Sequence, residues 1–377
     1  MAILITAIHG WFCYADAALS HQIIRIAVLN QVRDVVIATK GYYKISDPKT
    51  KTILFNARGL KNSLIRGQQE GIQIGHQIYP VRQLRIESNK TLKVFVRNHW
   101  QDYRGSIDIL LSKVQDNHLS VINRLDLEEY VRGVLYHEVS HKWPMQAIMA
   151  QAVAVRTYAL YQVQQNRKKS FDVTNDIYSQ VYGGKTAERY RTNIAAKRTL
   201  GEVLFFGGEV LPAYYHSNSG GRTEDVAELW KQDLLPLKGV VDPYSKGAPN
   251  YKWKKSFRSK DIQDKLNEYG YNLGLIKEIR VLERNPSGRI RKIKIMTRDG
   301  KETILPGKDF REMIGPNIIK SNFYDIEMKG YYFDVLGYGW GHGVGMCQWG
   351  AYNMSRQRFN YKEILRYYYP GSEIRRL

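Results

Sequence analysis

LDLEEYVRGVLYHEVSHKWPMQAIMAQAVAVRTY, residues 125–158, is the stretch that decides which fold we expect. Its first part predicts a helix that continues toward Val139, and Pro144 suits the first turn of a second helix over residues 145–164. The second helix carries apolar residues spaced for one buried face, namely Ile148, Ala152, Val155 and Ala159. Because helices and strands do not alternate regularly along the rest of the chain, we expect an α+β fold.

Strand-like segments dominate the chain before this stretch. Short runs with partial two-residue alternation, separated by turn residues, lie at 23–29, 35–39, 51–55, 91–96 and 106–111. We therefore expect a smaller β-rich N-terminal module over residues 21–112 and a mixed domain over residues 113–377. In the mixed domain we expect further strands at 201–215, 279–282 and 290–296, and a closing helix at 361–368.

The composition is that of a folded and strongly basic chain. Of its 377 residues, 43% are hydrophobic and 12% aromatic, which argues against disorder. Lys and Arg number 57 against 36 Asp and Glu, giving a formal net charge of +21. A surface of this charge attracts nucleic acid, anionic membrane or anionic wall polymer. No nucleic-acid-binding motif accompanies the charge, so we expect no nucleic-acid partner.

Residues 1–20 have the pattern of a leader. They form a short apolar run, and the small residues Ala15 and Ala17 resemble a signal-peptide cleavage site. The basic segment that usually opens a signal peptide is missing, and the run is too short for a membrane-spanning helix. We expect export to the periplasm or cell envelope, with a buried N-terminal helix as the alternative. The cysteines, Cys13 and Cys347, offer no zinc framework.

A zinc-protease pattern occurs inside the deciding stretch. The segment HEVSH at 137–141 matches H-E-x-x-H, in which two histidines on one helical face bind zinc and the glutamate is the general base. Pro144, however, would break such a helix soon after His141. The longer metzincin pattern needs glycine and histidine where this chain has Pro144 and Ala147. A zinc metalloprotease, with a separate ligand such as Glu188, is the least favoured alternative, and we expect no metal or other cofactor.

Two polar segments rich in glycine follow. Residues 214–224, YYHSNSGGRTE, lack the G-x-S-x-G pattern of α/β hydrolases, and we interpret them as a sugar-binding loop or a tight turn. Residues 337–346, GYGWGHGVGM, have glycine at every odd position. So many glycines indicate close backbone approach, either to a ligand or in a packing contact. The spacing is not that of a phosphate-binding loop.

Together these blocks resemble the SpoIID/LytB family. The deciding stretch is similar to the family's core signature, and residues 216–221, HSNSGG, are similar to its H-S-T-S-G-G. Residues 339–351, GWGHGVGMCQWGA, resemble its closing G-W-G-H-G-V-G-M-S-Q-x-G-A. The three blocks occur in the family's order. The resemblance implies a mixed catalytic domain with a glycan-binding cleft.

The resemblance also implies action on peptidoglycan glycan strands. The family's catalytic glutamate falls on Glu138 and its helix arginine on Arg156. A lytic transglycosylase can use one glutamate twice, first as acid on the glycosidic oxygen and then as base on the muramyl 6-hydroxyl, to leave a 1,6-anhydro end. Glu138 should then have a raised pKa, with Trp143 and Tyr136 as apolar neighbours. The resemblance gives substrate-binding roles to His216, Ser217, Ser219, Gly220, Gly221, Trp340, His342 and Gln348.

Arg156 would lower the pKa of Glu138 if the two paired, so we expect it to orient substrate or stabilise developing charge instead. The alternative is a structural ion pair of Glu138 and Arg156 at a helix junction. Met149 stands where the family often has lysine, which keeps open a non-catalytic glycan-binding amidase enhancer. Thr174 and Ser179 stand near two cysteines that help bind zinc in some relatives, so a family-type zinc site is not expected. The expected partners are glycan strands and an N-acetylmuramoyl-L-alanine amidase, with peripheral association with wall or membrane.

Overall fold

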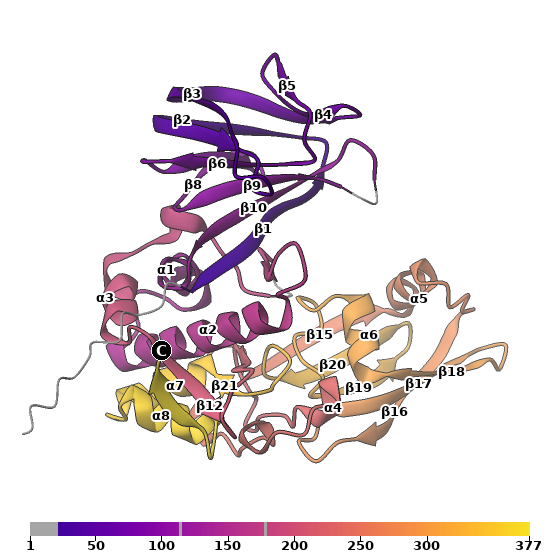
Figure 1. Cartoon of the computed structure of the whole chain (residues 1–377). Coiled ribbons are helices and arrows are strands. Elements are labelled where there is room, and N and C mark those ends of the chain that lie inside the picture. Colours follow the sequence, from indigo (N-terminus) through magenta and orange to yellow (C-terminus); the bar gives the residue numbers. More distant parts are fainter. Residues whose placement is uncertain (1–21, 113–114, 177–178) are drawn as a thin grey trace, which may run out of the picture.

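The computed structural model describes residues 22–112, 115–176 and 179–377, and it shows the expected α+β fold. The predicted leader, residues 1–20, lies outside the described residues. A β-rich body, a helical layer and a second β-rich body on one side of that layer make up the molecule (Figure 1). Among the helices described, none has the length and apolar character needed to cross a bilayer.

The N-terminal body is one large, almost entirely antiparallel sheet. Its order is β11-β1-β10-β9-β6-β2-β3-β4-β5, with β7 on β2 and β8 on β7. The strands are β1 (Ile23–Val32), β2 (Asp34–Ser46), β3 (Ile53–Gln68), β4 (Gly71–Ile74), β5 (Gln77–Tyr79), β6 (Gln83–Ser88), β7 (Leu92–Val96), β8 (His99–Tyr103), β9 (Ser106–Leu111), β10 (Leu119–Asp126) and β11 (Val173–Thr174). One face of the sheet is fully buried, as the alternation of Leu84 and Ile86 in β6 with polar neighbours illustrates.

The predicted boundary between residues 112 and 113 falls inside this sheet. Strand β10 is hydrogen-bonded to β9 from Leu119 opposite Leu111 to Arg124 opposite Ser106, and β11 adds to β1. The sheet therefore continues to Asp126, where the chain passes directly into the first helix. Whether the N-terminal module folds separately stays a prediction.

Two helices from the deciding stretch form the centre of the molecule. Helix α1 (Leu127–Glu138) begins at Asp126, whose side chain accepts from the Glu128 backbone N–H, and α2 (Met145–Gln165) follows Pro144. All four residues of the predicted apolar face of α2 are buried, and burial extends around most of the helix because the sheet covers one side and the C-terminal elements cover the other (Figure 1). Helix α3 (Tyr190–Arg198) packs beside both helices.

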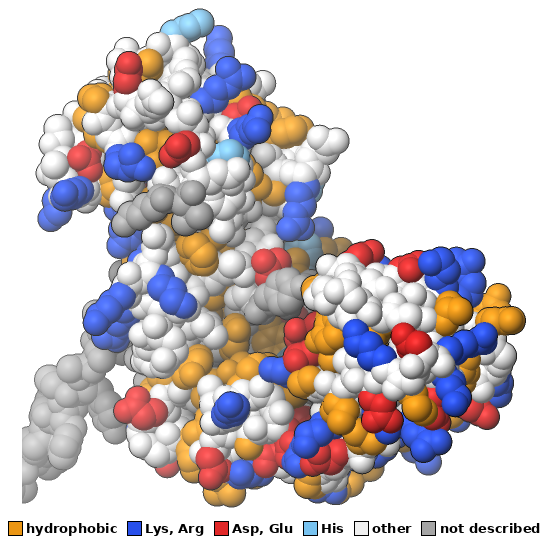
Figure 2. Space-filling model, turned by 90° about the vertical axis from the view of Figure 1, so that its right-hand side faces the viewer, with side chains coloured by type: hydrophobic (Ala, Val, Ile, Leu, Met, Phe, Trp, Pro, Cys, Tyr) orange, Lys and Arg blue, Asp and Glu red, His pale blue; other side chains and the backbone are white. Residues whose placement is uncertain are grey.

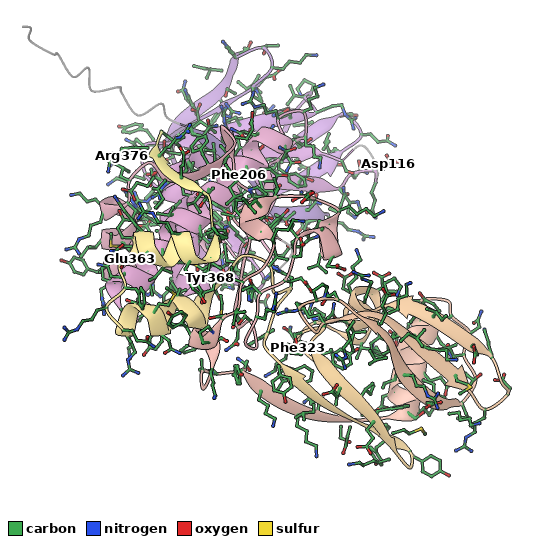
Figure 3. The ribbon with its side chains drawn as sticks, turned by 90° about the horizontal axis from the view of Figure 1, so that it is seen from below. Asp116, Phe206, Phe323, Glu363, Tyr368 and Arg376 are labelled. Carbon is green, nitrogen blue, oxygen red and sulfur yellow. The ribbon has the colours of Figure 1, made fainter. Side chains whose placement is uncertain are left out.

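Short strands and two closing helices lie under α2. They are β12 (Glu202–Phe206), β13 (Glu209–Val210), β14 (Tyr215–His216), β21 (Met346–Cys347), α7 (Gln348–Arg356), α8 (Tyr361–Tyr368) and β22 (Glu373–Arg376). In Figure 3 the α8 residues Glu363 and Tyr368 lie close to the strands that carry Phe206 and Arg376. Strand β14 pairs with β21 in parallel, with His216 opposite Cys347, although the two strands lie far apart along the chain. This pairing brings the two predicted polar segments together.

Residues 252–338 build a third body with its own apolar core. It contains the sheets β15-β20-β19 and β16-β17-β18, and its core includes Trp253, Phe310 and Phe333. The elements are β15 (Lys252–Arg258), α5 (Ser259–Glu268), β16 (Ile276–Arg284), β17 (Ile290–Thr297), β18 (Glu302–Pro306), α6 (Gly307–Ile314), β19 (Tyr324–Lys329) and β20 (Tyr332–Tyr338). Figure 3 shows this body, which we call the side module, set apart from the rest.

Candidate functional site

A cavity of about 320 Å³ lies where α1, β14, α7 and the glycine-rich segment meet. Glu138 is one of the residues that line the cavity. It is the last residue of α1, since the backbone becomes extended at Val139 and the helix ends there. The cavity is lined by Glu138, Tyr158, Asp176, Ser179, Val181, Tyr214, Tyr215, His216, Ser217, Trp230, Trp340, Gly341, His342 and Gln348. Of the ten predicted site residues, it therefore brings together Glu138, His216, Ser217, Trp340, His342 and Gln348.

The Glu138 carboxyl group is shielded from water and is bound by three hydrogen-bond donors. Part of the Glu138 surface opens on the cavity, but protein surrounds its carboxyl group, and this burial raises its pKa to about 7. Three donors oppose the rise: the Val181 backbone N–H, the Gln348 side-chain amide at 3.3 Å and the Tyr215 hydroxyl. The group can therefore be protonated near neutral pH, and its anion also has partners ready.

A chain of buried hydrogen bonds fixes the direction in which the Tyr215 hydroxyl donates. The Tyr130 hydroxyl donates to the Gln180 side-chain oxygen at 2.9 Å, so the Gln180 amide nitrogen faces Tyr215 and donates to its hydroxyl oxygen at 2.9 Å. Since the Tyr215 oxygen accepts from Gln180, its single proton is free to point at Glu138. This network positions the donor that faces the carboxyl.

Two neutral histidines form another part of the cavity wall. His216 Nδ1 lies 3.1 Å from the Val344 carbonyl, so Nδ1 carries the proton and Nε2 has a free lone pair. That Nε2 atom is buried and has no hydrogen-bond partner among the residues that the structure describes. His342 Nδ1 accepts from the Val344 N–H, and burial lowers the pKa of His342 to about 4. His216 thus keeps a neutral ring whose acceptor is enclosed by protein and left without a donor among the described residues.

Aromatic rings supply most of the apolar surface of the cavity. Tyr214 stacks on Trp230 with ring centroids 4.3 Å apart, and Trp230 meets His342 edge-on at 5.3 Å. On the glycine-rich segment, Lys320 lies over the Trp340 ring at 5.2 Å. Flat apolar rings beside polar groups suit the faces of sugar rings.

Close backbone packing explains the glycines of 337–346. Only Gly337 lies in a strand, and the next four glycines have positive φ, so the segment is a looped path rather than an extended ribbon. A Cβ at Gly345 would lie 2.0 Å from the Tyr214 carbonyl oxygen, and one at Gly339 would lie 2.6 Å from the Asn218 carbonyl oxygen. The predicted close approach is confirmed, and it is to the chain's own backbone.

Arg156 is not in the cavity, contrary to the expectation that it orients substrate. Its guanidinium is fully buried and pairs with both carboxylate oxygens of Glu128, at 2.6 and 2.8 Å. It also donates to the Glu202 and Ala196 carbonyls. Arg156 thus joins α1, α2 and the chain around β12 through an ion pair with Glu128, not with Glu138 as the structural alternative had it.

Ser219, Gly220 and Gly221 also lie outside the cavity lining. The Ser219 hydroxyl donates to buried Asp242 at 2.6 Å, which turns it away from the cavity. A Cβ at Gly220 would meet the Tyr338 backbone at 2.8 Å, and one at Gly221 would approach only the Tyr251 ring. These three residues shape the turn that carries His216 and Ser217, so the tight-turn interpretation holds for the second half of the segment.

The zinc-protease pattern does not form a zinc site. Helix α1 ends at Glu138, so His137 and His141 do not share a helical face. The His141 ring packs on Tyr136, His137 abuts Gly183, and Glu188 is bound to Arg104. Within the described ranges no group of three His, Cys, Asp or Glu side chains could hold a metal ion.

Sequence reasoning missed several cavity residues, above all Tyr215. Tyr215 lies in the segment 214–224, but only its neighbours were given roles. Trp230, Tyr158 and Val181 reach the cavity through packing of distant elements, which no local pattern reports. Asp176, whose side chain accepts from the Thr174 hydroxyl at 2.9 Å, adds a second carboxylate to the lining.

Comparisons with known proteins identify two matched regions of the chain. Residues 115–206 match the family described as Stage II sporulation protein, and residues 231–345 match a domain of unknown function (DUF8618) that includes the side module. The chain is similar to an uncharacterised protein of Brachyspira hyodysenteriae, at 30% identity over 356 residues, which cover 94% of this chain and 93% of the relative.

Two of the named relatives are proteins of Bacillus subtilis. Stage II sporulation protein D is 30% identical over 269 residues, or 67% of this chain and 75% of that protein. The protein named Amidase enhancer is 27% identical over 293 residues, or 65% of this chain and 40% of that protein. The three blocks of sequence, the match to the family and the extent of these similarities lead to one conclusion: the chain belongs to the SpoIID/LytB family.

Proposed function

We propose that this chain is an exported cell-wall enzyme, a lytic transglycosylase that cleaves peptidoglycan glycan strands with Glu138 as its general acid and base. The observation that carries the proposal is the raised pKa of Glu138, about 7, in a cavity with aromatic walls. A carboxylic acid in that range can give up a proton and take one back near neutral pH. The names of the two Bacillus subtilis relatives support a role at the cell wall.

In the first step, protonated Glu138 donates its proton to the glycosidic oxygen. The bond between that oxygen and C1 of N-acetylmuramic acid breaks, the oxygen leaves as a hydroxyl, and positive charge develops at the sugar ring. The Glu138 anion is left beside the donors Tyr215, Gln348 and the Val181 N–H. These groups strengthen their hydrogen bonds as the negative charge forms.

In the second step, the Glu138 carboxylate accepts the proton of the muramyl 6-hydroxyl. The 6-oxygen bonds to C1 of the same sugar and closes the 1,6-anhydro ring, and Glu138 is again protonated. No water is consumed, and atoms and charge balance over the two steps. Tyr214 with Trp230 packs against a sugar face.

Asp176 supports one competing function, a glycan hydrolase. Hydrolytic glycosidases normally use two carboxyl groups, and Asp176 shares the cavity with Glu138. The two functions differ in their products, since a hydrolase leaves a reducing muramic acid and a transglycosylase leaves a 1,6-anhydro end. The name of the Amidase enhancer relative favours a third, non-catalytic function in which the cavity binds glycan to assist an amidase.

The test is mass spectrometry of soluble products from sacculi, intact or treated with an amidase. Wild-type protein and Glu138→Gln are compared, each with and without EDTA. Anhydro-muramyl products from the wild type alone, with no effect of EDTA, are the expected result. Reducing ends in place of anhydro ends would favour the hydrolase. A complete lack of glycan cleavage on both substrates would contradict both enzymes and favour the amidase enhancer.

The remaining proposals concern location and partners. We place the protein in the periplasm or cell envelope, acting with an N-acetylmuramoyl-L-alanine amidase. The excess of 21 positive charges favours association with anionic wall or membrane surfaces. Fractionation of cells that express the full-length chain tests the location, and an amidase activity raised by wild-type and Glu138→Gln protein alike would separate recruitment from cleavage.

A further inference from the structure

A second polar pocket lies on the N-terminal sheet, lined by none of the residues around Glu138. Its volume is about 450 Å³. Four cationic side chains and one carboxylate line it: Lys44, Lys51, Arg85, Arg124 and Glu87. The strand register explains how they meet, because Lys44 on β2 is opposite Glu87 on β6, and Arg85 on β6 is opposite Asp108 on β9. Figure 2 shows Lys and Arg side chains spread over both β-rich bodies, so charge by itself does not distinguish this pocket.

Ion pairs compensate only half of these cations. Arg85 donates to both carboxylate oxygens of Asp108, at 2.6 and 2.8 Å, and the Lys44 ammonium lies 3.0 Å from Glu87. Both nearby carboxylates are therefore engaged. With respect to the described part of the chain, the side chains of Arg124 and Lys51 form no hydrogen bond or ion pair. The pocket thus has two cationic groups with unused donors.

Arg124 is the stronger of the two anion sites. Its side chain is half-buried on the sheet. Burial and the neighbouring Arg85 lower the pKa of its guanidinium, while the nearby carboxylates of Asp108 and Glu87 act in the opposite direction. A cation that is partly removed from water and placed near other cations is stabilised when an anion joins it. A carboxylate suits this position because the guanidinium can donate two parallel hydrogen bonds to it.

An adjoining pocket adds the features of a sugar site. Its volume is about 460 Å³, and it shares Lys44 and Glu87 with the cationic pocket. Its lining includes the side chains of Tyr42, Asn56 and Asn89. Tyr42 is 61% exposed, and the Arg58 guanidinium, which also lines this pocket, lies over its ring at 5.5 Å. The two amides can both donate and accept. We call the two pockets together the sheet groove.

We propose that the sheet groove binds an anionic sugar of the glycan strand, with its carboxylate on Arg124 and Lys51 and a neighbouring ring on Tyr42. The proposal rests on the proposed function, because the carboxylate is the lactyl group of N-acetylmuramic acid, which is free once the stem peptide has been removed. The groove then holds a long strand at a second point while another part lies at Glu138. A phosphate of another wall polymer shares the anionic chemistry and is distinguished below.

Binding of defined glycan to the full chain tests the groove. In a Glu138→Gln background, which prevents cleavage, we compare the unchanged groove with Arg124→Gln plus Lys51→Gln. These substitutions leave the Arg85–Asp108 and Lys44–Glu87 pairs in place. The probe is long amidase-treated glycan with free lactyl carboxylates, and the comparison probe is the same glycan with these carboxylates converted to amides.

The double substitution is expected to weaken binding of the free-carboxylate glycan about tenfold and to leave binding of the amidated glycan unchanged. Tyr42→Leu should weaken both probes about fivefold, because a ring face is lost whatever the charge. The matched control, Lys277→Gln plus Lys308→Gln on exposed positions of the side module, removes the same charge and should change neither value.

Several results would contradict the proposal that the sheet groove binds an anionic sugar. They are equal losses in the groove and control variants, equal affinity of the unchanged groove for both probes, or binding only when phosphate-bearing wall polymer is present. Failure of the proposed function is measured separately, as absence of anhydro products when protein with Glu138 intact digests short amidase-treated fragments. If the wild type cleaves glycan but Arg124→Gln plus Lys51→Gln binds it unaltered, the groove proposal fails and the proposed function stands.

Discussion

Tyr215→Phe should shift the pH dependence of cleavage upward while slowing the reaction. The Tyr215 hydroxyl faces Glu138 and lowers its pKa, whereas burial raises that pKa to about 7. A hydrogen bond to a charged group contributes roughly 1.5–3 kcal/mol, and one pKa unit corresponds to about 1.4 kcal/mol. Loss of the hydroxyl should therefore raise the pKa of Glu138 by about one unit or more.

The sign of the effect follows from the role of Glu138 as an acid. Cleavage requires protonated Glu138, so activity falls as pH rises through its pKa. In Tyr215→Phe the fall should move to higher pH by about one unit. The anion left after proton donation loses the same donor, so kcat on the acid side of the profile should drop about tenfold.

The assay is the rate of release of soluble glycan from amidase-treated sacculi between pH 5 and pH 9. Tyr158→Phe is the matched control, because Tyr158 lines the same cavity while its hydroxyl faces Gln162 and Ser179. In Tyr158→Phe, activity should fall over the same pH range as in the wild type. The reasoning would be refuted if activity fell at the wild-type pH in Tyr215→Phe, or if that pH moved by the same amount in both variants.

Three further outcomes follow from the structure. Arg156→Met should cost about 3–5 kcal/mol of unfolding free energy by urea denaturation, because Glu128 is left without its partner; a loss below about 1 kcal/mol would contradict a structural role. Trp230→Ala should raise KM about fivefold with little change in kcat, since a ring face for the sugar is lost; a fall in kcat alone would argue against it. His342→Asn should flatten the loss of stability in acid. The pKa of His342 is about 4 in the folded chain against an ordinary 6.5, so the wild type should lose about 3 kcal/mol as pH falls from 6.5 to 4. The variant should lose less in urea titrations over that range, and identical curves would count against this assignment.

Local patterns predicted the helices and strands with the strongest periodicity. Helix α8 (Tyr361–Tyr368) agrees with the predicted residues, and α2 ends one residue beyond the predicted end. Strands β6 and β8 were not predicted, because each is short and carries only two or three apolar residues among charged and amide side chains. Which side chains of these strands face the core can be recognised only once the neighbouring strands are known.

The cavity was predicted from motifs, and motifs do not specify which way a side chain points. Glu138 and His216 both line the cavity, but Arg156 turns to Glu128 because α2 is buried on nearly all sides. Trp143 was expected beside Glu138, yet it packs on Trp349 and Tyr352 and does not line the cavity. The apolar surroundings of the carboxyl come instead from segments far away in sequence.

Cleavage in water enriched in the heavy oxygen isotope tests the central claim most directly. Amidase-treated sacculi are digested by the wild-type chain, and the muramyl ends are analysed by mass spectrometry. If Glu138 acts alone and the 6-hydroxyl attacks C1, the new ends are anhydro sugars that carry no heavy oxygen. Muramyl ends that carry one heavy oxygen would show that water attacks C1, and would contradict the account in which a single glutamate serves as both acid and base.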